Sequence, residues 1–252
     1  AILESGNMRF AVRTDKGMVR DINEDSYRII TGYSDIPDTF IVADGMGGHN
    51  SGEVASKMAV DFVSNEILRT PGIFSKKDDI LHCISELMQK ANSVVYESSL
   101  KNIENFGMGT TLIIAVACDD KLYIGHIGDS RVYLIRGNEM HKITTDHSYI
   151  EELIKTGSLT REEAQNHPKK HVITRALGCS EDIVVDTYLS DIKDDDAFII
   201  CTDGLTNMLD EEEIKRIVTN IDDIDAVCEE LVRKTNENGG MDNVTVIVIR
   251  NN

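Results

Sequence analysis

The chain has 252 residues and a formal net charge of −18 at pH 7, from 26 Lys and Arg against 44 Asp and Glu. A nucleic-acid-binding protein needs basic side chains to replace the counterions of the phosphates, and anionic lipid surfaces repel an acidic protein, so we expect neither partner. No apolar run approaches the ~20 residues that span a bilayer, and no basic segment followed by an apolar one marks a secretory signal.

Hydrophobic residues make up 41% of the chain and occur in periodic blocks, which predicts a folded protein in spite of the charge. No linker rich in Pro, Gly or Ser divides the chain, so we expect one domain over residues 8–252. We expect residues 1–7 to be a loose extension or a remnant of cloning. The five cysteines match no zinc-binding spacing and predict buried thiols in a reducing compartment, hence a cytoplasmic protein.

Strands are predicted from apolar runs of four to seven residues. Nearly continuous runs, typical of strands that are buried on both faces, occupy 40–43, 111–117, 197–201 and 244–249. Weaker strand patterns occupy 8–13, 25–31 and 184–189. Residues 121–135 have the pattern of a hairpin around the Gly128-Asp129 turn.

Helices are predicted where apolar residues recur at helical spacing, over 52–69, 79–98, a short segment after Asp210, and 223–236. Asn50 with Glu53, and Asp210 with Glu213, have the spacing of N-terminal caps. The helices come in consecutive blocks between the strands, which favours an α+β fold over a doubly wound parallel sheet. Covered strands with short connections predict two mostly antiparallel sheets packed face to face, with helices outside each, in an α-β-β-α sandwich of four layers.

Aspartates fall at the ends of the predicted strands. Their positions are Asp44 after 40–43, Asp203 after 197–202 and Asp242 before 244–249, with Asp129 in the 128–129 turn. Neighbouring ends of antiparallel strands share one edge of the core, so we expect these carboxylates to gather there, although each Asp-Gly pair alone is typical of an ordinary turn. Crowded, buried carboxylates need protons or cations, and oxygen ligands without paired Cys or His favour Mg²⁺ or Mn²⁺ over zinc.

One arginine lies close to this cluster in the sequence. Arg20 precedes Asp25 by five residues within the stretch 17–25. A lone arginine is usually a solvated surface charge, but beside a divalent metal cluster it is well suited to bind a phosphate through two hydrogen bonds. The combination predicts a phosphoester substrate.

Eight stretches in a fixed order resemble the motifs of the metal-dependent Ser/Thr protein phosphatases of type 2C (the PPM family), in the compact bacterial form. They are Gly17–Asp25, Val42–His49, Gly107–Leu112, Gly125–Tyr133, Thr145–Ser148, Ile173–Gly178, Cys201–Leu205 and Asp242–Val246. The resemblance covers residues 8–249, which is essentially the whole domain. It implies the same sandwich of two antiparallel sheets flanked by helices.

The resemblance also implies a metal centre. Carried over by position, Asp44 bridges two Mn²⁺ or Mg²⁺ ions, the carbonyl group of Gly45 binds one of them, and Asp203 and Asp242 bind the other. Asp129 matches an aspartate that helps to hold a third, weaker ion together with Asp203.

Three further residues match functional positions of the family. Arg20 matches the arginine that binds the substrate phosphate. Glu24 and Asp25 match acidic residues that hold water molecules on the metal ions rather than the ions themselves.

The implied activity is hydrolysis of phosphoserine and phosphothreonine by direct attack of a water or hydroxide that bridges the two ions. The leaving alkoxide needs a proton. Eukaryotic members carry a histidine for this purpose where this chain has Met46, so His49 or a metal-bound water is the expected donor.

Residues 148–172 occupy the position of the family's mobile flap and contain the basic group Lys169-Lys170-His171. We expect this flap to select protein substrates, although an ordinary solvated helical excursion would have the same pattern. Expected partners are phosphorylated proteins, including a bacterial Ser/Thr kinase, and the chain is expected to be a monomer. The alternative, a catalytically inactive binding module, would have lost some of the ligands, and a two-metal nuclease would need a basic surface.

Overall fold

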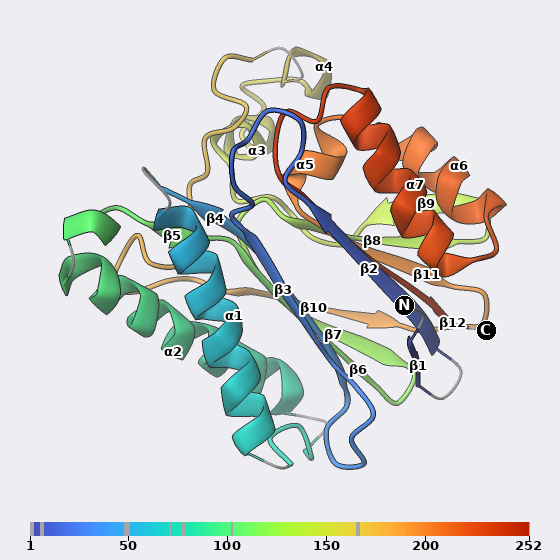
Figure 1. The fold of residues 1–252 in the computed structure, drawn as a ribbon, viewed down its shortest axis with the longest axis horizontal. Helices are drawn as coiled ribbons and strands as arrows, with labels where there is room; N and C mark the ends of the chain where they lie inside the picture. The colour runs from blue at the N-terminus through green and yellow to red at the C-terminus, as the bar shows by residue number, and fades with distance from the viewer. Residues whose placement is uncertain are drawn as a thin grey trace.

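The computed structural model describes residues 3–5, 8–47, 51–70, 72–76, 79–101, 103–164 and 167–251. Two antiparallel sheets pack face to face in these residues (Figure 1). The first sheet has the order β1 (Leu3–Ser5), β2 (Met8–Asp15), β12 (Val244–Asn251), β11 (Ala197–Cys201), β8 (Arg131–Arg136), β9 (Glu139–Lys142). The second has the order β10 (Asp186–Asp191), β7 (Lys121–Ile127), β6 (Leu112–Cys118), β4 (Asp38–Met46), β3 (Asp25–Ile30), with β5 (Gly109–Thr110) paired to the end of β4.

Helices cover the outer face of each sheet (Figure 1). On the second sheet lie α1 (Ser51–Arg69) and α2 (Ile80–Lys101), which is followed by the short helix η2 (Ile103–Asn105). On the first sheet lie α6 (Glu211–Asn220) and α7 (Ile224–Glu237), while α5 (Asp203–Thr206) follows β11 directly. The flap region contains α3 (Tyr149–Lys155) and α4 (Arg161–Ala164). The four-layer fold that the sequence predicts is confirmed.

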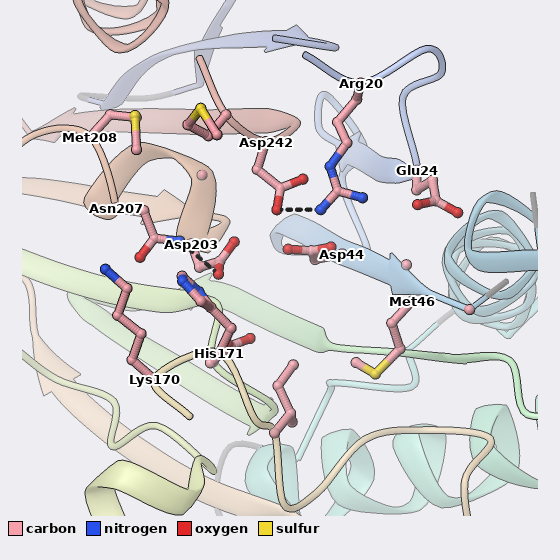
Figure 2. Close-up of a pocket in the computed structure, with 16 residues that line it drawn as sticks. Arg20, Glu24, Asp44, Met46, Lys170, His171, Asp203, Asn207, Met208 and Asp242 are labelled. Carbon is pink, nitrogen blue, oxygen red and sulfur yellow. Dashed lines mark hydrogen bonds and ion pairs between the residues drawn. The ribbon is translucent and has the colours of Figure 1, made fainter. Parts of the chain in front are cut away.

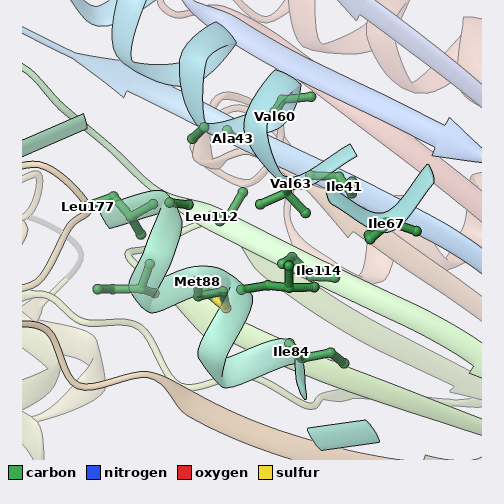
Figure 3. Close-up of a cluster of buried hydrophobic side chains, with 14 of the residues drawn as sticks. Ile41, Ala43, Val60, Val63, Ile67, Ile84, Met88, Leu112, Ile114 and Leu177 are labelled. Atoms are coloured by element: carbon green, nitrogen blue, oxygen red, sulfur yellow. The ribbon is translucent and has the colours of Figure 1, made fainter. Parts of the chain in front are cut away.

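Three hydrophobic clusters fill the spaces between the four layers, and strand β4 shows why. Its side chains alternate, so Ile41 and Ala43 pack under α1 and α2 (Figure 3), whereas Phe40 and Val42 pack between the sheets. A strand with both faces covered reads as a continuous apolar run, which explains the pattern seen in the sequence.

The predicted hairpin over 121–135 is wrong, because its two strands belong to different sheets. Strand β7 pairs with β6 and β10, and β8 pairs with β11 and β9. The turn at residues 128–130 therefore carries the chain from one sheet to the other. The sequence pattern marks two strands and a turn, but it does not distinguish pairing from a crossing between layers.

The ends of the predicted elements differ from the structure in a few places. Strand β1 lies within residues 1–7, which we left out of the expected fold, and it pairs with β2. The cap predicted at Asp210 is confirmed, since its carboxylate accepts a hydrogen bond of 2.8 Å from the amide of Glu213. The cap predicted at Asn50 lies outside the described residues. No helix in the described part of the chain is both long and apolar enough to cross a membrane.

Gly125 allows α2 to pack closely on β7. A β-carbon at this position would collide with Cγ2 of Ile84 and would lie 2.7 Å from the sulfur of Met88. Ile84 is branched at its β-carbon and cannot turn away easily within a helix. We expect Gly125→Ala to lower the free energy of unfolding by about 1–3 kcal/mol, measured by urea unfolding.

A double-mutant cycle provides the control. Ile84→Ala removes the colliding carbon, so Gly125→Ala is expected to cost less in that background than in the unmodified protein. Equal costs in the two backgrounds would show that the close contact between α2 and β7 is not what Gly125 provides.

Candidate metal centre

Antiparallel pairing brings the predicted aspartates to one edge of the sandwich. Asp44 on β4 lies directly opposite Asp25 on β3. Asp203 begins α5 and is separated from the end of β11 only by Thr202, and Asp242 lies two residues before β12, the antiparallel neighbour of β11. Asp129 reaches the same place from the crossing between the two sheets. The gathering of carboxylates that strand order predicted is therefore present.

A cavity of about 630 Å³ opens at this edge (Figure 2). Its lining includes every predicted metal ligand, namely Asp44, Gly45, Asp129, Asp203 and Asp242. Arg20 and Glu24 also belong to the lining. Asp25, beside Asp44 on the neighbouring strand, is buried and is not part of the lining. His49, one of the two expected proton donors, lies outside the described residues.

The carboxylates of the cavity repel one another. Burial raises the pKa of Asp44 well above its usual range, and the neighbouring Asp25, Asp203 and Asp129 raise it further. Burial is also the main cause that raises the pKa of Asp25 to about 7 and of Asp129 to about 8, and it raises the pKa of Asp203. The cluster is thus an unfavourable site for so many negative charges unless protons or cations compensate them.

Two carboxylate oxygens in the cluster are buried without a hydrogen-bond partner. They are Oδ1 of Asp25 and Oδ1 of Asp129. An orphaned buried oxygen is costly, and a cation or an ordered water would satisfy it. These two atoms fit a metal centre and its water molecules.

Among the residues that the structure describes, no group of three or more His, Cys, Asp or Glu side chains is already arranged to hold a metal ion. Mg²⁺ is typically bound through only one or two carboxylates and keeps several waters, so an open arrangement of carboxylates around a cavity suits it. The donor set contains oxygen atoms alone, which suits Mg²⁺ and Mn²⁺.

Asp25, on β3 of the second sheet, links the two sheets by hydrogen bonds to residues in and beside the first. Its Oδ2 atom accepts hydrogen bonds from the hydroxyl groups of Thr202 at 2.9 Å and Thr245 at 2.7 Å. The amide of Thr245 in turn donates to the hydroxyl oxygen of Thr202 at 2.9 Å. Sequence reasoning assigned no role to either threonine. The only local signs of such a role were their positions, Thr202 next to Asp203 and Thr245 within β12.

Two histidines hold the turn that carries Asp129. The amide of Gly128 donates to Nδ1 of His147 at 3.1 Å, and Nε2 of His126 lies 2.8 Å from the carbonyl oxygen of Ser130. Burial lowers the pKa of His126 to about 4, so the ring is neutral and its Nε2 donates to that carbonyl. Nε2 of His147 donates to Asp186 at 3.0 Å. His126 and His147 therefore hold this turn in place.

The glycines that follow the aspartates are required by packing. A β-carbon on Gly45 would overlap the carbonyl group of Gly52 at the start of α1, and one on Gly204 would overlap the carbonyl oxygen of Asn243. Gly17, at a φ of +79°, similarly lies against the carbonyl group of Asp242. These close contacts bring the segments that carry the carboxylates together.

Arg20 points into the cavity and pairs with Asp242, with 2.8 Å between Nη2 and Oδ2 (Figure 2). The loop that carries it is fixed by Asn243, whose side-chain amide donates to the carbonyl groups of Lys16 and Ile22. Asn243 also accepts a hydrogen bond of 2.8 Å from the amide of Glu24. Sequence reasoning did not assign this role to Asn243, because its partners lie more than 200 residues away.

The basic group of the flap divides between two environments. Lys170 and His171 line the cavity beside Asp203, and Asn207 donates a hydrogen bond of 2.9 Å to Asp203 from the same side (Figure 2). Lys169 turns away, with its ammonium group 5.1 Å from the centre of the Tyr149 ring.

The raised pKa of Asp129 predicts how stability depends on pH in the metal-free protein. The native state binds the proton of the Asp129 carboxyl group more tightly than the unfolded chain does. The contribution of this proton to the free energy of unfolding is therefore lost as pH rises from 3.8 towards about 8. We therefore expect Asp129→Asn to stabilise the EDTA-treated protein by an amount that grows over this range, measured by urea unfolding at a series of pH values. Asp194→Asn, at an exposed loop position, serves as the control. A gain that does not change with pH would contradict the buried, repelled state of Asp129.

Comparisons with known proteins identify the family. Residues 19–244 match the family model described as Protein phosphatase 2C. The serine/threonine phosphatase stp of Listeria innocua is 36% identical over 97% of this chain and 96% of its own. The protein phosphatase PhpP of Streptococcus pneumoniae is 36% identical over 97% of this chain and 98% of its own.

Solved structures agree with these relatives. The S. agalactiae serine/threonine phosphatase has a TM-score of 0.92 at 32% identity and covers 97% of this chain and 100% of its own. The catalytic domain of the phosphatase PstP, solved in complex with 2 manganese ions, has a TM-score of 0.83 at 32% identity and covers 96% of this chain and 97% of its own. Sequence, fold and the carboxylate-lined cavity lead to one conclusion: the chain belongs to the protein phosphatase 2C family and is a protein serine/threonine phosphatase.

Proposed function

We propose that the carboxylate-lined cavity is the catalytic centre and that it works with two Mn²⁺ or Mg²⁺ ions. The observation that carries this proposal is the set of buried, mutually repelling carboxylates around the cavity, two of whose oxygens lack a partner. The two manganese ions of the PstP structure support it. Asp44, the carbonyl group of Gly45, Asp203 and Asp242 would hold these ions, and Asp129 with Asp203 would hold a third, weaker one.

When bound, such ions stabilise the negative charge of the transferring phosphoryl group and make water acidic enough to attack phosphorus at neutral pH. The chain supplies the other parts of the reaction. Arg20 binds the phosphoryl oxygens through its planar guanidinium group. Glu24 and the orphaned Oδ1 of Asp25 orient water molecules, because carboxylates accept hydrogen bonds from them.

The contact between Arg20 and Asp242 gives the arginine a second function. At 2.8 Å it partly compensates the charge of Asp242 in the metal-free protein. A divalent ion on Asp242 would take over this compensation and leave the guanidinium group available for phosphate. Metal and phosphate binding would thus favour one another.

Several finer points belong to the same proposal. The leaving alkoxide receives its proton from His49 or from a metal-bound water. The substrates include a bacterial Ser/Thr kinase, and the enzyme acts as a monomer in the cytoplasm. The cysteines support this compartment, because all five lie in the described part of the chain and none forms a disulfide. The expectation of buried thiols holds for Cys201 and Cys228 but is wrong for Cys179, which is exposed.

Loss of the central carboxylate tests the proposal directly. We expect the unmodified protein to hydrolyse a phosphothreonine peptide with Mn²⁺ and not with EDTA, and Asp44→Asn to reduce this turnover to background. Isothermal titration with Mn²⁺ measures the accompanying loss of metal binding. Asp38→Asn is a matched control on the same strand, since an amide oxygen still accepts the 2.7 Å hydrogen bond from Thr31. An active, metal-binding Asp44→Asn protein would overturn the assignment.

Arg20 provides a second test. We expect Arg20→Ala to lower kcat/KM on the same peptide by about 10²–10³-fold, as for other groups that stabilise transition-state charge. Arg20→Lys is expected to recover only part of this loss, because an ammonium group lacks the planar fork. Arg28→Ala, on the exposed side of β3, is the control. Full activity of Arg20→Ala would exclude a role in phosphate binding.

A further inference from the structure

Two methionines line the catalytic cavity near Asp242, and a third lies beside the same Gly239–Gly240 turn. Met208 and Met241 belong to its lining, and Met18 lies in the loop that carries Arg20. Met18 is 69% exposed and Met241 is 56% exposed. We refer to Met18, Met208 and Met241 together as the methionine lip.

The methionine lip is assembled around the Gly239–Gly240 turn. The amide of Met18 donates a hydrogen bond of 2.8 Å to the carbonyl oxygen of Gly240. A β-carbon on Gly239 would lie 3.8 Å from the sulfur of Met208 and 3.8 Å from Cγ of Met241. Three segments that are far apart in the sequence therefore bring apolar side chains to one place, next to Asp242 and the arginine that pairs with it.

The wall that faces the lip has a different character. In Figure 2, Met208 lies on the same side of the cavity as Asp242, whereas Lys170 and His171 approach Asp203 from the other side. The cavity thus has the methionine lip beside Asp242 and has Lys170 and His171 beside Asp203, while Met46 and Ile173 supply further apolar lining.

A single exposed apolar side chain is ordinary on a protein surface, but an adjoining group of them commonly marks a binding site. The residues on either side of a phosphorylated Ser or Thr must cross this mouth when the phosphate reaches Arg20. Methionine is unbranched and polarisable, so a lip of methionines adapts to apolar partners of different shape. Position and chemistry together therefore select one occupant, an apolar side chain of the substrate polypeptide.

We propose that the methionine lip binds an apolar residue next to the phosphorylated residue, and that the enzyme therefore prefers phosphoprotein segments with such a neighbour. This inference rests on the proposed function, because the catalytic centre fixes where the phosphate lies. It extends that function by assigning a substrate class and three residues that select it.

Two phosphothreonine peptides test the proposal. They are identical except that one has Leu on both sides of the phosphothreonine and the other has Ser there. With the Mn²⁺-loaded protein we expect kcat/KM to be about tenfold higher for the Leu peptide, mainly through a lower KM, as partial burial of a leucine side chain provides. We expect the double variant Met18→Gln/Met241→Gln to reduce this ratio to near 1.

Matched variants separate binding from folding. Met18→Leu/Met241→Leu keeps the lip apolar and is expected to keep the preference. Val184→Gln replaces an apolar residue that is 66% exposed and outside the cavity lining, so it is expected to leave the ratio unchanged. Thermal unfolding of each variant establishes that the fold is intact.

The two proposals fail in different ways. Metal-dependent turnover without a preference for the Leu peptide, or a preference that persists in the glutamine double variant, would overturn the lip and leave the catalytic centre standing. Absence of metal-dependent turnover with both peptides would contradict the proposed function and the lip together.

Discussion

Mutual repulsion among carboxylates at one edge of the sandwich is the constraint that organises this molecule. Antiparallel register places Asp25 opposite Asp44, and the neighbouring ends of β11 and β12 add Asp203 and Asp242. Burial then makes each negative charge more costly than it would be in water. The fold can hold this arrangement because the three hydrophobic clusters between its four layers stabilise it and offset the free-energy cost of the buried charges.

The residues around the cluster hold its members in place and compensate only part of their negative charge. Thr202 and Thr245 bind one oxygen of Asp25 and leave the other without a partner. His147 fixes the turn of Asp129, and Asn243 fixes the loop of Arg20. A site whose geometry is set by hydrogen bonds to the backbone and by close glycine contacts keeps its shape even though its charges repel one another, and this preorganisation is what electrostatic catalysis requires.

The sequence predicts the carboxylates better than the residues that support them, for a physical reason. A strand ending in Asp-Gly is a local pattern, and antiparallel pairing is enough to bring such ends together. By contrast, Asn243 and Thr245 act on partners more than 200 residues away, and nothing local marks these contacts. The failed hairpin has the same origin, since the choice between pairing and crossing at the 128–130 turn depends on which layer each strand covers.

The acidity of the chain makes its few local cations important for the approach of a phosphorylated protein. A phosphate dianion meets an average field that repels it, so the cavity mouth must present positive charge within about a Debye length, ~8 Å at physiological salt. Arg20, Lys170 and His171 all line the cavity, whereas Lys169 of the same basic group packs on Tyr149 instead. The flap therefore contributes positive charge through one particular side chain, and the position of Lys170 matters more than the number of basic residues in the flap.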